Sequence, residues 1–268
     1  MEASRVSRAQ RYAIIPARMQ SSRFPGKPLA DLHGKPLVQH VYERVREAAV
    51  FDEIVVATDD ERIAHAVRTA GGTAQMTRSD HATGTERVAE VAAALPPNTL
   101  VCNVQGDEPI LPPGLLRDLV EFVESKPQID MATAAHPASD ACGRTNRNVV
   151  KVLLNRQGRA LYFSRAAVPF AGDGAGHYLR HVGIYAFRQE ALQRFVRFPV
   201  GDLEEREGLE QLRALENGMP IDVLVTRYIT HGVDTPDDLK AVASRFGRSL
   251  ESLRTKAKSS LGDSGSEI

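Results

Sequence analysis

The sequence predicts an α/β fold in which a mainly parallel sheet is covered by helices on both faces. Short, continuously apolar runs such as 12–16 (YAIIP) and 53–58 (EIVVAT) are typical of strands that are buried on both faces. Amphipathic segments separate these runs, and such alternation of strand and helix indicates a parallel sheet. The chain has 268 residues, 42% hydrophobic and 25% charged, so it can bury a sizeable core.

The first half of the chain is expected to repeat strand and helix. Its predicted strands are at 12–16, 53–58 and 99–104. Its predicted helices are at 36–50, 59–72, 84–95 and 114–125, where apolar residues recur at helical spacing. The helix at 59–72 has acidic residues in its first turn and glycines at its end, which favour those boundaries.

The second half changes character between about Met131 and Phe187, where strands show more polar alternation and glycine-rich loops join them. We expect this part to hold an antiparallel element, a substrate wall or a dimer contact. Strands are predicted at 131–138, 148–155, 181–188 and 221–229, and helices at 202–218 and 235–247. One domain at 12–247 would then follow a flexible N-terminus at 1–11 and precede a polar C-terminal tail at 248–268.

Charge and composition exclude several classes of function. Lys and Arg number 34, as do Asp and Glu, so no global charge attracts nucleic acid or an anionic membrane. No apolar run approaches the roughly 20 residues that span a bilayer, and the start lacks the apolar region of a secretory signal. Two cysteines make no disulfide framework, and Cys102 lies in an apolar strand as a small core residue. A cytoplasmic protein is expected.

A basic loop follows the first predicted strand. It carries Arg18, Arg23 and Lys27, and no acidic residue lies among them before Asp31. Ligands of open parallel sheets bind beyond the carboxyl ends of the strands, where this loop begins. Because three neighbouring cations repel one another unless an anion is present, the loop predicts a polyphosphate site. The alternative is a solvated surface loop.

Other phosphate motifs do not explain this loop. It has no Lys-Ser/Thr pair before a helix, as a Walker loop requires, and the glycines at 172, 174 and 176 lack the spacing of a dinucleotide fingerprint. GKPL occurs twice, at Gly26 and Gly34, but the second copy places Pro36 at a helix start. Lys35 is therefore the weaker phosphate candidate.

Two acids are candidates for holding a metal ion. Asp107 follows the strand at 99–104, and Asp234 lies between the last strand and a helix. Asp234 could instead cap that helix, although Thr235 can do so and leave Asp234 free; for Asp107 the alternative is a plain turn. Magnesium commonly takes one or two protein carboxylates, with phosphate oxygens and water as its other ligands. The loop, the acids and the sheet edge together suggest nucleotidyl transfer.

Histidines suggest no transition-metal site. His177 and His181 lie in a segment that is predicted to be extended, and four residues of strand span about 13 Å, too far to share an ion.

Eight segments, in order and spanning nearly all of Tyr12–Phe246, resemble the 3-deoxy-manno-octulosonate cytidylyltransferases, or CMP-Kdo synthetases. The segments are 14–41 (IIPARMQSSRFPGKPLADLHGKPLVQHV), 56–67 (VATDDERIAHAV), 76–91 (MTRSDHATGTERVAEV), 103–109 (NVQGDEP), 160–169 (ALYFSRAAVP), 179–187 (LRHVGIYAF), 209–218 (LEQLRALENG) and 232–239 (GVDTPDDL). The resemblance implies a Rossmann-like, mainly parallel sheet of the nucleotide-diphospho-sugar transferase type, with a smaller lobe used for dimerisation. It also implies that CTP and 3-deoxy-D-manno-octulosonate (Kdo) form CMP-Kdo and pyrophosphate for lipopolysaccharide biosynthesis, in a magnesium-dependent cytoplasmic homodimer.

The resemblance assigns roles to individual residues. The nucleotide would be bound by residues of the first loop, of the segment at 76–91 and of the strand end: Ala17, Arg18, Arg23, Lys27, Arg78, Asp80, Thr85 and Gln105. Kdo would contact Gln105, Arg165, His181, Tyr185, Glu210 and Gln211, with Arg165 suited to its carboxylate. Asp107 and Asp234 would hold Mg²⁺ and act in catalysis with Arg18 and Lys27.

Alternatives remain at this point. The acceptor could be another acidic sugar, of the 8-amino-Kdo or sialic acid type, because the sequence does not resolve one sugar substituent. A non-catalytic nucleotide-binding module is the rival from another class, although a mere binder has no need of both Asp107 and Asp234. A nicotinamide dehydrogenase is disfavoured by the missing glycine fingerprint. Singly, Tyr185 could be a plain strand residue, Glu210 a surface charge and His181 a half-buried structural histidine.

Overall fold

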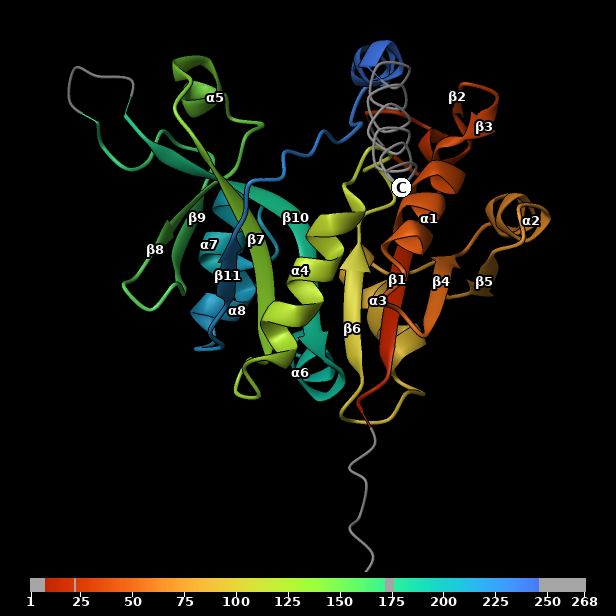
Figure 1. Cartoon of the computed structure of the whole chain (residues 1–268), viewed down its shortest axis with the longest axis horizontal. Helices are drawn as coiled ribbons and strands as arrows, with labels where there is room; N and C mark the ends of the chain where they lie inside the picture. The colour runs from red at the N-terminus through yellow and green to blue at the C-terminus, as the bar shows by residue number, and fades with distance from the viewer. Residues whose placement is uncertain (1–7, 22, 172–175, 246–268) are drawn as a thin grey trace, which may run out of the picture.

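The computed structural model describes residues 8–21, 23–171 and 176–245. Within them one nine-stranded sheet has the order β11-β7-β10-β6-β1-β4-β5, with β8 pairing β10 and β9 pairing β8 (Figure 1). Its strands are β1 (Arg11–Ala17), β4 (Glu53–Thr58), β5 (Thr73–Met76), β6 (Leu100–Val104), β7 (Met131–Ala138), β8 (Lys151–Leu154), β9 (Ala160–Ser164), β10 (Tyr178–Arg188) and β11 (Asp222–Val225). β2 (Asp31–Leu32) and β3 (Lys35–Pro36) form a separate small ribbon.

Helices connect these strands. They are η1 (Lys27–Leu29), α1 (Leu37–Ala48), α2 (Glu61–Thr69), α3 (Gly84–Ala92), α4 (Pro113–Glu124), α5 (Ala141–Thr145), α6 (Gln189–Phe195), α7 (Asp202–Glu207) and α8 (Leu212–Glu216), with a further helix described over 236–245. β1 begins at Arg11, one residue before the expected domain start. The expected tail at 248–268, residues 1–7 and most of the glycine run at 172–176 lie outside the described residues.

The strand directions confirm the mainly parallel sheet. β4, β1 and β6 pair in parallel, as do β4 with β5 and β7 with β11. β10 lies between β6 and β7 and runs antiparallel to both, so all the other strands along the main path point the same way. The antiparallel element that was expected between Met131 and Phe187 is therefore β10, extended sideways by the antiparallel strands β8 and β9.

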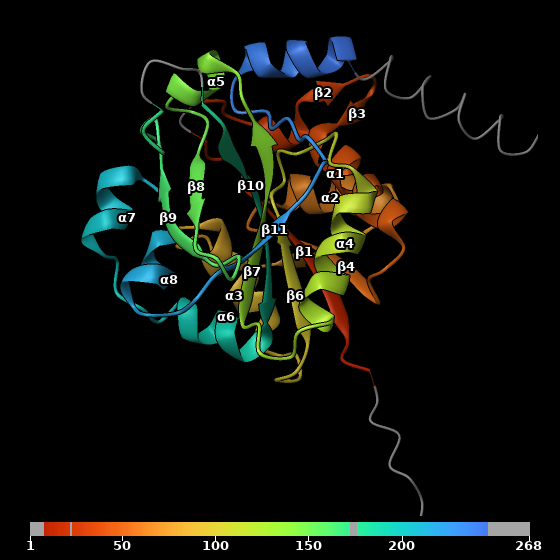
Figure 2. The same cartoon turned by 60° about the vertical axis from the view of Figure 1, so that its left-hand side comes forward.

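The sheet separates two hydrophobic layers, which explains the continuously apolar strands. Ala13 and Ile15 pack on one face with buried residues of α1, α2 and α4. Ile14, between them in sequence, packs on the opposite face with α3, α6 and α8. Successive strand residues point to opposite faces, so both faces of β1 must be apolar. Figure 2 shows α1, α2 and α4 on one side of the sheet and α6, α7 and α8 on the other.

The prediction of one helix over 202–218 is wrong. Gly208 has a φ of 59° and ends α7, and its N–H donates to Glu204 O at 2.8 Å. Glycine enters this left-handed conformation without the steric cost that other residues meet, so it ends a helix readily. The chain turns through Leu209–Gln211 before α8 starts, and Gly218 ends α8 as expected. The break matters because Glu210 and Gln211 lie in the turn.

A buried ion pair joins the two short helices. Arg213 Nε and Nη2 donate to Glu204 Oε2 and Oε1, both at 2.7 Å, and both residues are buried. A buried charge that loses its partner keeps its desolvation cost, so we expect Arg213→Met to lower the free energy of unfolding by about 3–5 kcal/mol. Chemical denaturation measures this. Arg206→Met is the matched control, because the pair of Arg206 and Asp202 on α7 is exposed. Equal losses in the two variants would contradict the assignment.

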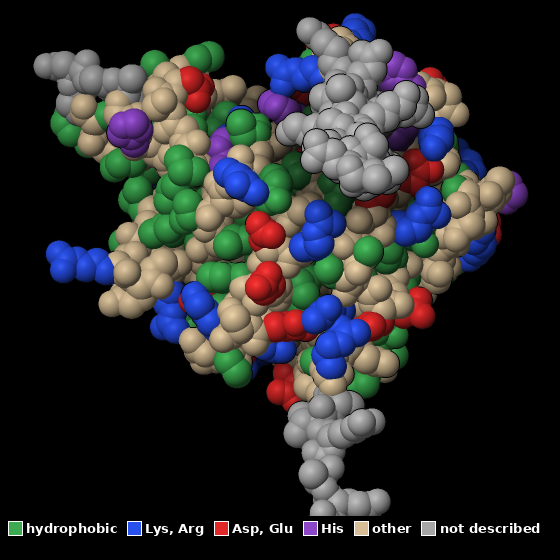
Figure 3. All heavy atoms as spheres, in the orientation of Figure 1, with side chains coloured by type: hydrophobic (Ala, Val, Ile, Leu, Met, Phe, Trp, Pro, Cys, Tyr) green, Lys and Arg blue, Asp and Glu red, His purple; other side chains and the backbone are tan. Residues whose placement is uncertain are grey.

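The visible surface is mixed in charge. In Figure 3, Lys and Arg side chains alternate with Asp and Glu, and hydrophobic side chains gather at the left, over β7, β8 and β11. The exposed large hydrophobic residues include Leu161 on β9, Phe170 after it and Val225 on β11. None of the helices in the described parts of the chain is long and apolar enough to cross a membrane. Cys102 is buried in β6, and burial raises the pKa of its thiol to about 12, which confirms a core cysteine.

Candidate active site

A cleft of about 280 Å³ opens at the carboxyl ends of β1 and β6. Seven of the predicted site residues line it: Ala17, Arg18, Arg23, Lys27, Gln105, Asp107 and Asp234. This confirms that the basic loop and both acids meet at one edge of the sheet. The cleft is also lined by residues that were not predicted from the sequence, among them Gln20, Ser21, Thr83, Gly84, Gly106 and Arg87.

Lys27 lies between the two acids. Its Nζ donates to Asp107 Oδ2 at 2.7 Å and to Val233 O at 3.0 Å, and it is 3.7 Å from Asp234 Oδ1. Arg23 Nη2 also donates to Asp234 Oδ1, at 2.9 Å. Lys27 and Arg23 therefore have counter-ions in the folded protein, and these come from residues more than 75 positions away that no local pattern reveals. Arg18 Nη1 donates to Ala82 O at 3.5 Å.

Asp234 is not needed to cap the following helix, because Thr235 does so. Asp238 N–H donates to Thr235 Oγ1 at 3.2 Å, and Thr235 N–H donates back to Asp238 Oδ2 at 2.8 Å. This reciprocal pair satisfies the donors at the helix start, as a capping box does. The prediction that Thr235 would cap the helix is confirmed.

The acid pair is suited to a divalent cation. Both carboxylates already face one ammonium group, so a single cation can lie within reach of both. No cluster of three or more His, Cys, Asp or Glu that could hold a metal occurs in the described parts of the chain. Two carboxylates without nitrogen or sulfur ligands suit magnesium rather than zinc.

Glu108 is a further acid at this edge that sequence reasoning missed. Burial, reinforced by the negative charge of Asp107, raises the pKa of Glu108 to about 8. Its carboxyl group is therefore mainly protonated at neutral pH and adds little negative charge beside Asp107. Its Oε2 has no hydrogen-bond partner among the described residues. Its adjacency to Asp107 in the segment GDEP could have drawn attention to it.

Gly106 sets the spacing between β1 and β6 at the cleft. A Cβ at this position would lie 2.8 Å from Pro16 O, and a backbone carbonyl cannot move aside cheaply. We expect Gly106→Ala to lower the free energy of unfolding by about 1–3 kcal/mol, because the overlap forces the two strand ends apart. Thermal or chemical denaturation measures this. Gly183→Ala is the comparison, since its Cβ would meet only Gln105 Cγ at 3.9 Å, an ordinary contact. A similar loss in both variants would contradict the steric explanation.

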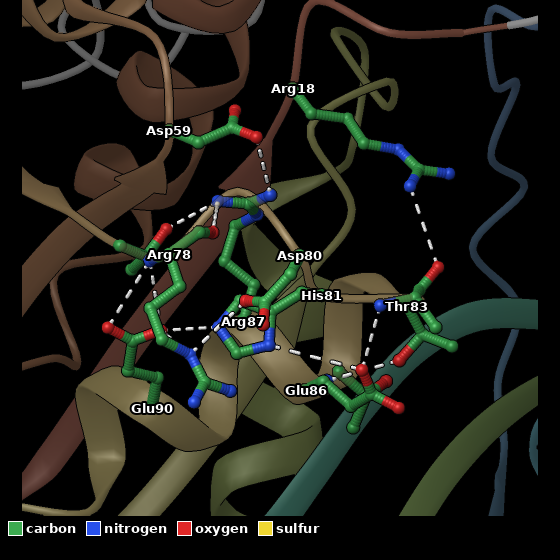
Figure 4. Close-up of polar contacts among 12 residues, drawn as sticks. Arg18, Asp59, Arg78, Asp80, His81, Thr83, Glu86, Arg87 and Glu90 are labelled. Carbon is green, nitrogen blue, oxygen red and sulfur yellow. Dashed lines mark hydrogen bonds and ion pairs between the residues drawn. The ribbon is translucent and has the colours of Figure 1, made fainter.

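Thr83 and Gly84 line the cleft opposite the basic loop, and charged side chains hold the surrounding segment 77–86 in place (Figure 4). Arg87, which is buried in α3, donates to Asp59 Oδ2 at 3.0 Å, to Arg78 O at 3.1 Å and to Thr77 Oγ1. The peptide of Ala82 is fixed on both sides, because its N–H donates to Glu86 Oε2 at 2.8 Å and its carbonyl accepts from Arg18. Arg18 is thus attached to the segment that faces it.

Arg78, Asp80 and Thr85 do not share one surface. Arg78 and Asp80 are exposed and lie 3.3 Å apart as an ion pair, and neither lines the cleft. Arg78 instead lines a more open groove of about 490 Å³ with His81 and Glu90, which are hydrogen-bonded to each other. Thr85 is buried. The reading of cytidine by these three residues stays a prediction.

Four of the predicted sugar-binding residues come from two elements: His181 and Tyr185 lie on β10, and Glu210 and Gln211 lie in the turn between α7 and α8. Glu210 Oε2 accepts from Thr85 Oγ1 at 2.7 Å, and burial raises the pKa of Glu210. Desolvation lowers the pKa of His181 to about 3 and raises that of Tyr185, so both side chains are neutral. The rings of His181 and Tyr185 are 5.6 Å apart. Glu210 Oε1 and Gln211 Nε2 are buried and have no partner among the described residues, as expected of groups that await a polar ligand.

Arg165 is engaged differently from the prediction. Its Nε, Nη1 and Nη2 donate to Glu207 O at 2.7 Å, Arg147 O at 3.0 Å and Gly208 O at 3.3 Å. A guanidinium has five N–H groups, so about two remain for a carboxylate. The contacts bind Arg165 to the turn that carries Glu210.

Lys35, the weaker phosphate candidate, pairs with Glu43 at 2.9 Å and does not line the cleft.

A mainly parallel sheet with a basic loop and two carboxylates at its carboxyl edge is the arrangement of a nucleotidyltransferase. The cytidylyltransferase family model matches residues 12–221. The 3-deoxy-manno-octulosonate cytidylyltransferase of Syntrophobacter fumaroxidans is 52% identical over 234 residues, 85% of this chain and 94% of the relative. That of Geobacter sulfurreducens is 46% identical over 246 residues, 87% and 98% of the two chains.

Solved structures agree with these relatives. A CMP:2-keto-3-deoxy-manno-octonic acid synthetase complexed with CTP is 41% identical, with a TM-score of 0.85, and the match covers 90% of this chain and all of the other. The 4-diphosphocytidyl-2C-methyl-D-erythritol synthase of Anaerococcus prevotii is 16% identical with a TM-score of 0.58 over 89% and 99% of the chains, which shows a shared fold only. The chain belongs to the cytidylyltransferase family, and within it to the 3-deoxy-manno-octulosonate cytidylyltransferases.

Proposed function

We propose that this protein transfers the cytidylyl group of CTP to Kdo, forming CMP-Kdo and releasing pyrophosphate for lipopolysaccharide biosynthesis. The observation that carries the proposal is the cleft in which Lys27 lies between Asp107 and Asp234, facing Arg18 and Arg23. The relatives named for this activity, and the similar structure that holds CTP, support it.

The nucleotide would bind with its triphosphate against the basic loop. Arg18 and Lys27 would neutralise the charge that builds on departing pyrophosphate, and Arg23 adds a third cation at the same wall. Asp107 and Asp234 would hold a magnesium ion, which supplies Lewis-acid polarisation of a phosphate oxygen. The remaining contribution of the chain is positioning, because no covalent enzyme intermediate is needed.

The acceptor would bind beside the cleft, at Gln105, His181, Tyr185, Glu210 and Gln211. The unpartnered Oε1 of Glu210 and Nε2 of Gln211 offer an acceptor and a donor to sugar hydroxyls. The anomeric hydroxyl of Kdo would then attack the α-phosphorus in line with the leaving pyrophosphate. Arg165 would contribute its remaining N–H groups to the sugar carboxylate.

Two further properties belong to the same proposal. We infer a homodimer formed through the lobe of β8 and β9, where Leu161 and Phe170 are among the most exposed large hydrophobic residues. We also infer a cytoplasmic location, which the free cysteines Cys102 and Cys142 support, since structural disulfides mark oxidising compartments.

The test is pyrophosphate release from CTP with magnesium, with and without Kdo, beside ATP, GTP and UTP. Release that requires both CTP and Kdo is the expected result. Release from CTP with an 8-amino-Kdo or sialic acid acceptor, but not with Kdo, would support the mechanism and show that the acceptor is a different acidic sugar. Measurable CTP binding without release for any acceptor would overturn the proposal in favour of a binding module.

A further inference from the structure

A chain of buried hydrogen bonds connects the sugar-side acid to the nucleotide cleft. Thr85 Oγ1 donates to Glu210 Oε2 at 2.7 Å, Asn103 Nδ2 donates to Thr85 Oγ1 at 3.1 Å, and Gln105 Nε2 donates to Asn103 Oδ1 at 3.3 Å. The chain runs from the turn between α7 and α8, through α3, to the end of β6. Asn103 is fully buried, whereas Gln105 lines the cleft.

Each link in this chain fixes the direction of the next. A threonine hydroxyl has one hydrogen, so when Asn103 donates to it, that hydrogen must go to Glu210. An amide has a donor end and an acceptor end, so the contact to Asn103 decides which end of Gln105 remains for the cleft. In this arrangement Gln105 Nε2 donates to Asn103 Oδ1, so Gln105 Oε1 is the end that can accept a hydrogen bond in the cleft.

We propose that Asn103 is a positioning residue, which sets the orientation of the Gln105 amide in the cleft according to the hydrogen bonding of Glu210. The proposal deepens the proposed function, since it rests on Gln105 contacting the substrates. Among the described residues, the hydrogen bonds of the Asn103 side-chain amide are to Thr85 and Gln105, and both belong to this series of hydrogen bonds. Asn103 therefore joins the two halves of the site from a buried position that does not line the cleft.

The reverse direction of the chain is equally complete. If Glu210 carries a proton, it donates to Thr85 Oγ1, Thr85 donates to Asn103 Oδ1, and Asn103 Nδ2 donates to Gln105 Oε1. This requires only that the two amides turn over, which exchanges oxygen and nitrogen at nearly the same positions. Gln105 Nε2 then faces the cleft as a donor, the polarity that a phosphate or carboxylate oxygen needs. The two protonation states of Glu210 thus present opposite ends of Gln105 to the substrates.

The surroundings of Glu210 allow both states. Burial is the main influence on the pKa of Glu210 and raises it, Glu204 raises it further, and the Thr85 and Thr83 hydroxyls and Arg213 lower it. Arg213 is itself held by Glu204, which limits its influence on Glu210. Tyr185 faces Glu210 from β10, and Glu86 acts on the same Arg213 from α3.

A direct test follows the side-chain amide of Gln105 by nuclear magnetic resonance in the free protein, labelled with ¹⁵N in glutamine. The resonance is identified by its loss in Gln105→Glu. The spectra are recorded in a parent protein that carries Glu108→Gln, because the pKa of Glu108 is raised to about 8 and Glu108 lies close to Gln105 in the sequence. Burial raises the pKa of Glu210, and as the pH is raised until Glu210 loses its proton we expect the shift of the Gln105 amide to change in one step. We expect no step in Glu210→Gln or in Asn103→Leu. A step that persists when either substitution is added to the Glu108→Gln parent, or no step in that parent, would overturn the proposal.

Kinetics separates positioning from stability. Asn103→Leu removes both side-chain hydrogen bonds at similar volume and should lower kcat/KM for the sugar by about 10- to 100-fold. Gln189→Met is the matched control, because Gln189 is also a buried amide. Its Nε2 donates to Ala92 O at 3.0 Å, a hydrogen bond that is not part of the series from Glu210 to Gln105. If the two variants lose kcat/KM equally, Asn103 is only structural. If the wild type releases no pyrophosphate from CTP with Kdo, the proposed function is contradicted. The resonance test needs no substrate, so it still decides whether Asn103 orients the Gln105 amide.

Discussion

Replacing Asp107 by alanine is expected to lower the rate of pyrophosphate release from CTP by about 100- to 1000-fold with magnesium saturating. Asp107 lies at the carboxyl end of β6, its Oδ2 is 2.7 Å from Lys27 Nζ, and it lines the cleft with Asp234. Its loss removes one of the two carboxylates proposed for the metal and also frees Lys27 from its nearest counter-ion. The measurement is initial rate against magnesium concentration, so that weaker metal binding and slower chemistry are separated.

The control for Asp107→Ala is Asp130→Ala. Asp130 also sits in an ion pair, at 2.5 Å from Arg194, but it precedes β7 at the opposite edge of the sheet. We expect Asp130→Ala to keep nearly the wild-type rate. Near-normal turnover of Asp107→Ala with magnesium saturating would show that the metal assignment is wrong.

Replacing Lys27 by methionine is expected to have the second large effect. Lys27 Nζ is shared between Asp107 and Val233 O, with Asp234 within 3.7 Å, so its ammonium occupies the position between the acids in the free protein. Without it, the two carboxylates repel each other and await a cation. We expect kcat/KM for CTP to fall by about 100- to 1000-fold, because charge on the leaving pyrophosphate loses a partner. We also expect magnesium to bind the free protein more tightly than it binds the wild type.

Two measurements check these expectations for Lys27→Met. Pyrophosphate release gives kcat/KM, and calorimetric titration of the free protein with magnesium gives the metal affinity. Lys35→Met is the matched control, since Lys35 stands in the second GKPL segment and pairs with Glu43 away from the cleft. Should Lys27→Met bind magnesium no better than Lys35→Met does, Lys27 would not be competing with metal for the acids.

The sequence predicted the strands that are continuously apolar and missed β5 and β9, as well as the short helices α5 and α6. β1, β4 and β6 were predicted because both of their faces pack against helices. β5 was missed, since its four residues are largely exposed at the sheet edge and carry no apolar run. β9 was also not predicted, because it pairs with β8 alone, so its partner cannot be read from local periodicity.

The candidate site, too, could be predicted only in part from the sequence. Arg18, Lys27 and Asp107 could be placed at one edge because each follows or ends a predicted strand. The ion pairs among them could not be foreseen, as they join residues that only the folded sheet brings together. Arg87 and Asn103 were missed for a related reason. Each is a polar residue inside an apolar element, and its hydrogen-bond partners come from other segments.

The position of Lys27 between Asp107 and Asp234 also bears on how the protein matures during synthesis. Val233 and Asp234 are more than 200 residues from Lys27, although β1, its basic loop and Asp107 are all made within the first half of translation. A nascent chain that ends before Val233 contains the basic loop and Asp107 but lacks Asp234. The cleft is therefore completed only when the segment before the helix at 236–245 folds back over the edge of the sheet. Under the proposed role of Asp234, nucleotidyl transfer requires a chain that has been synthesised beyond this residue.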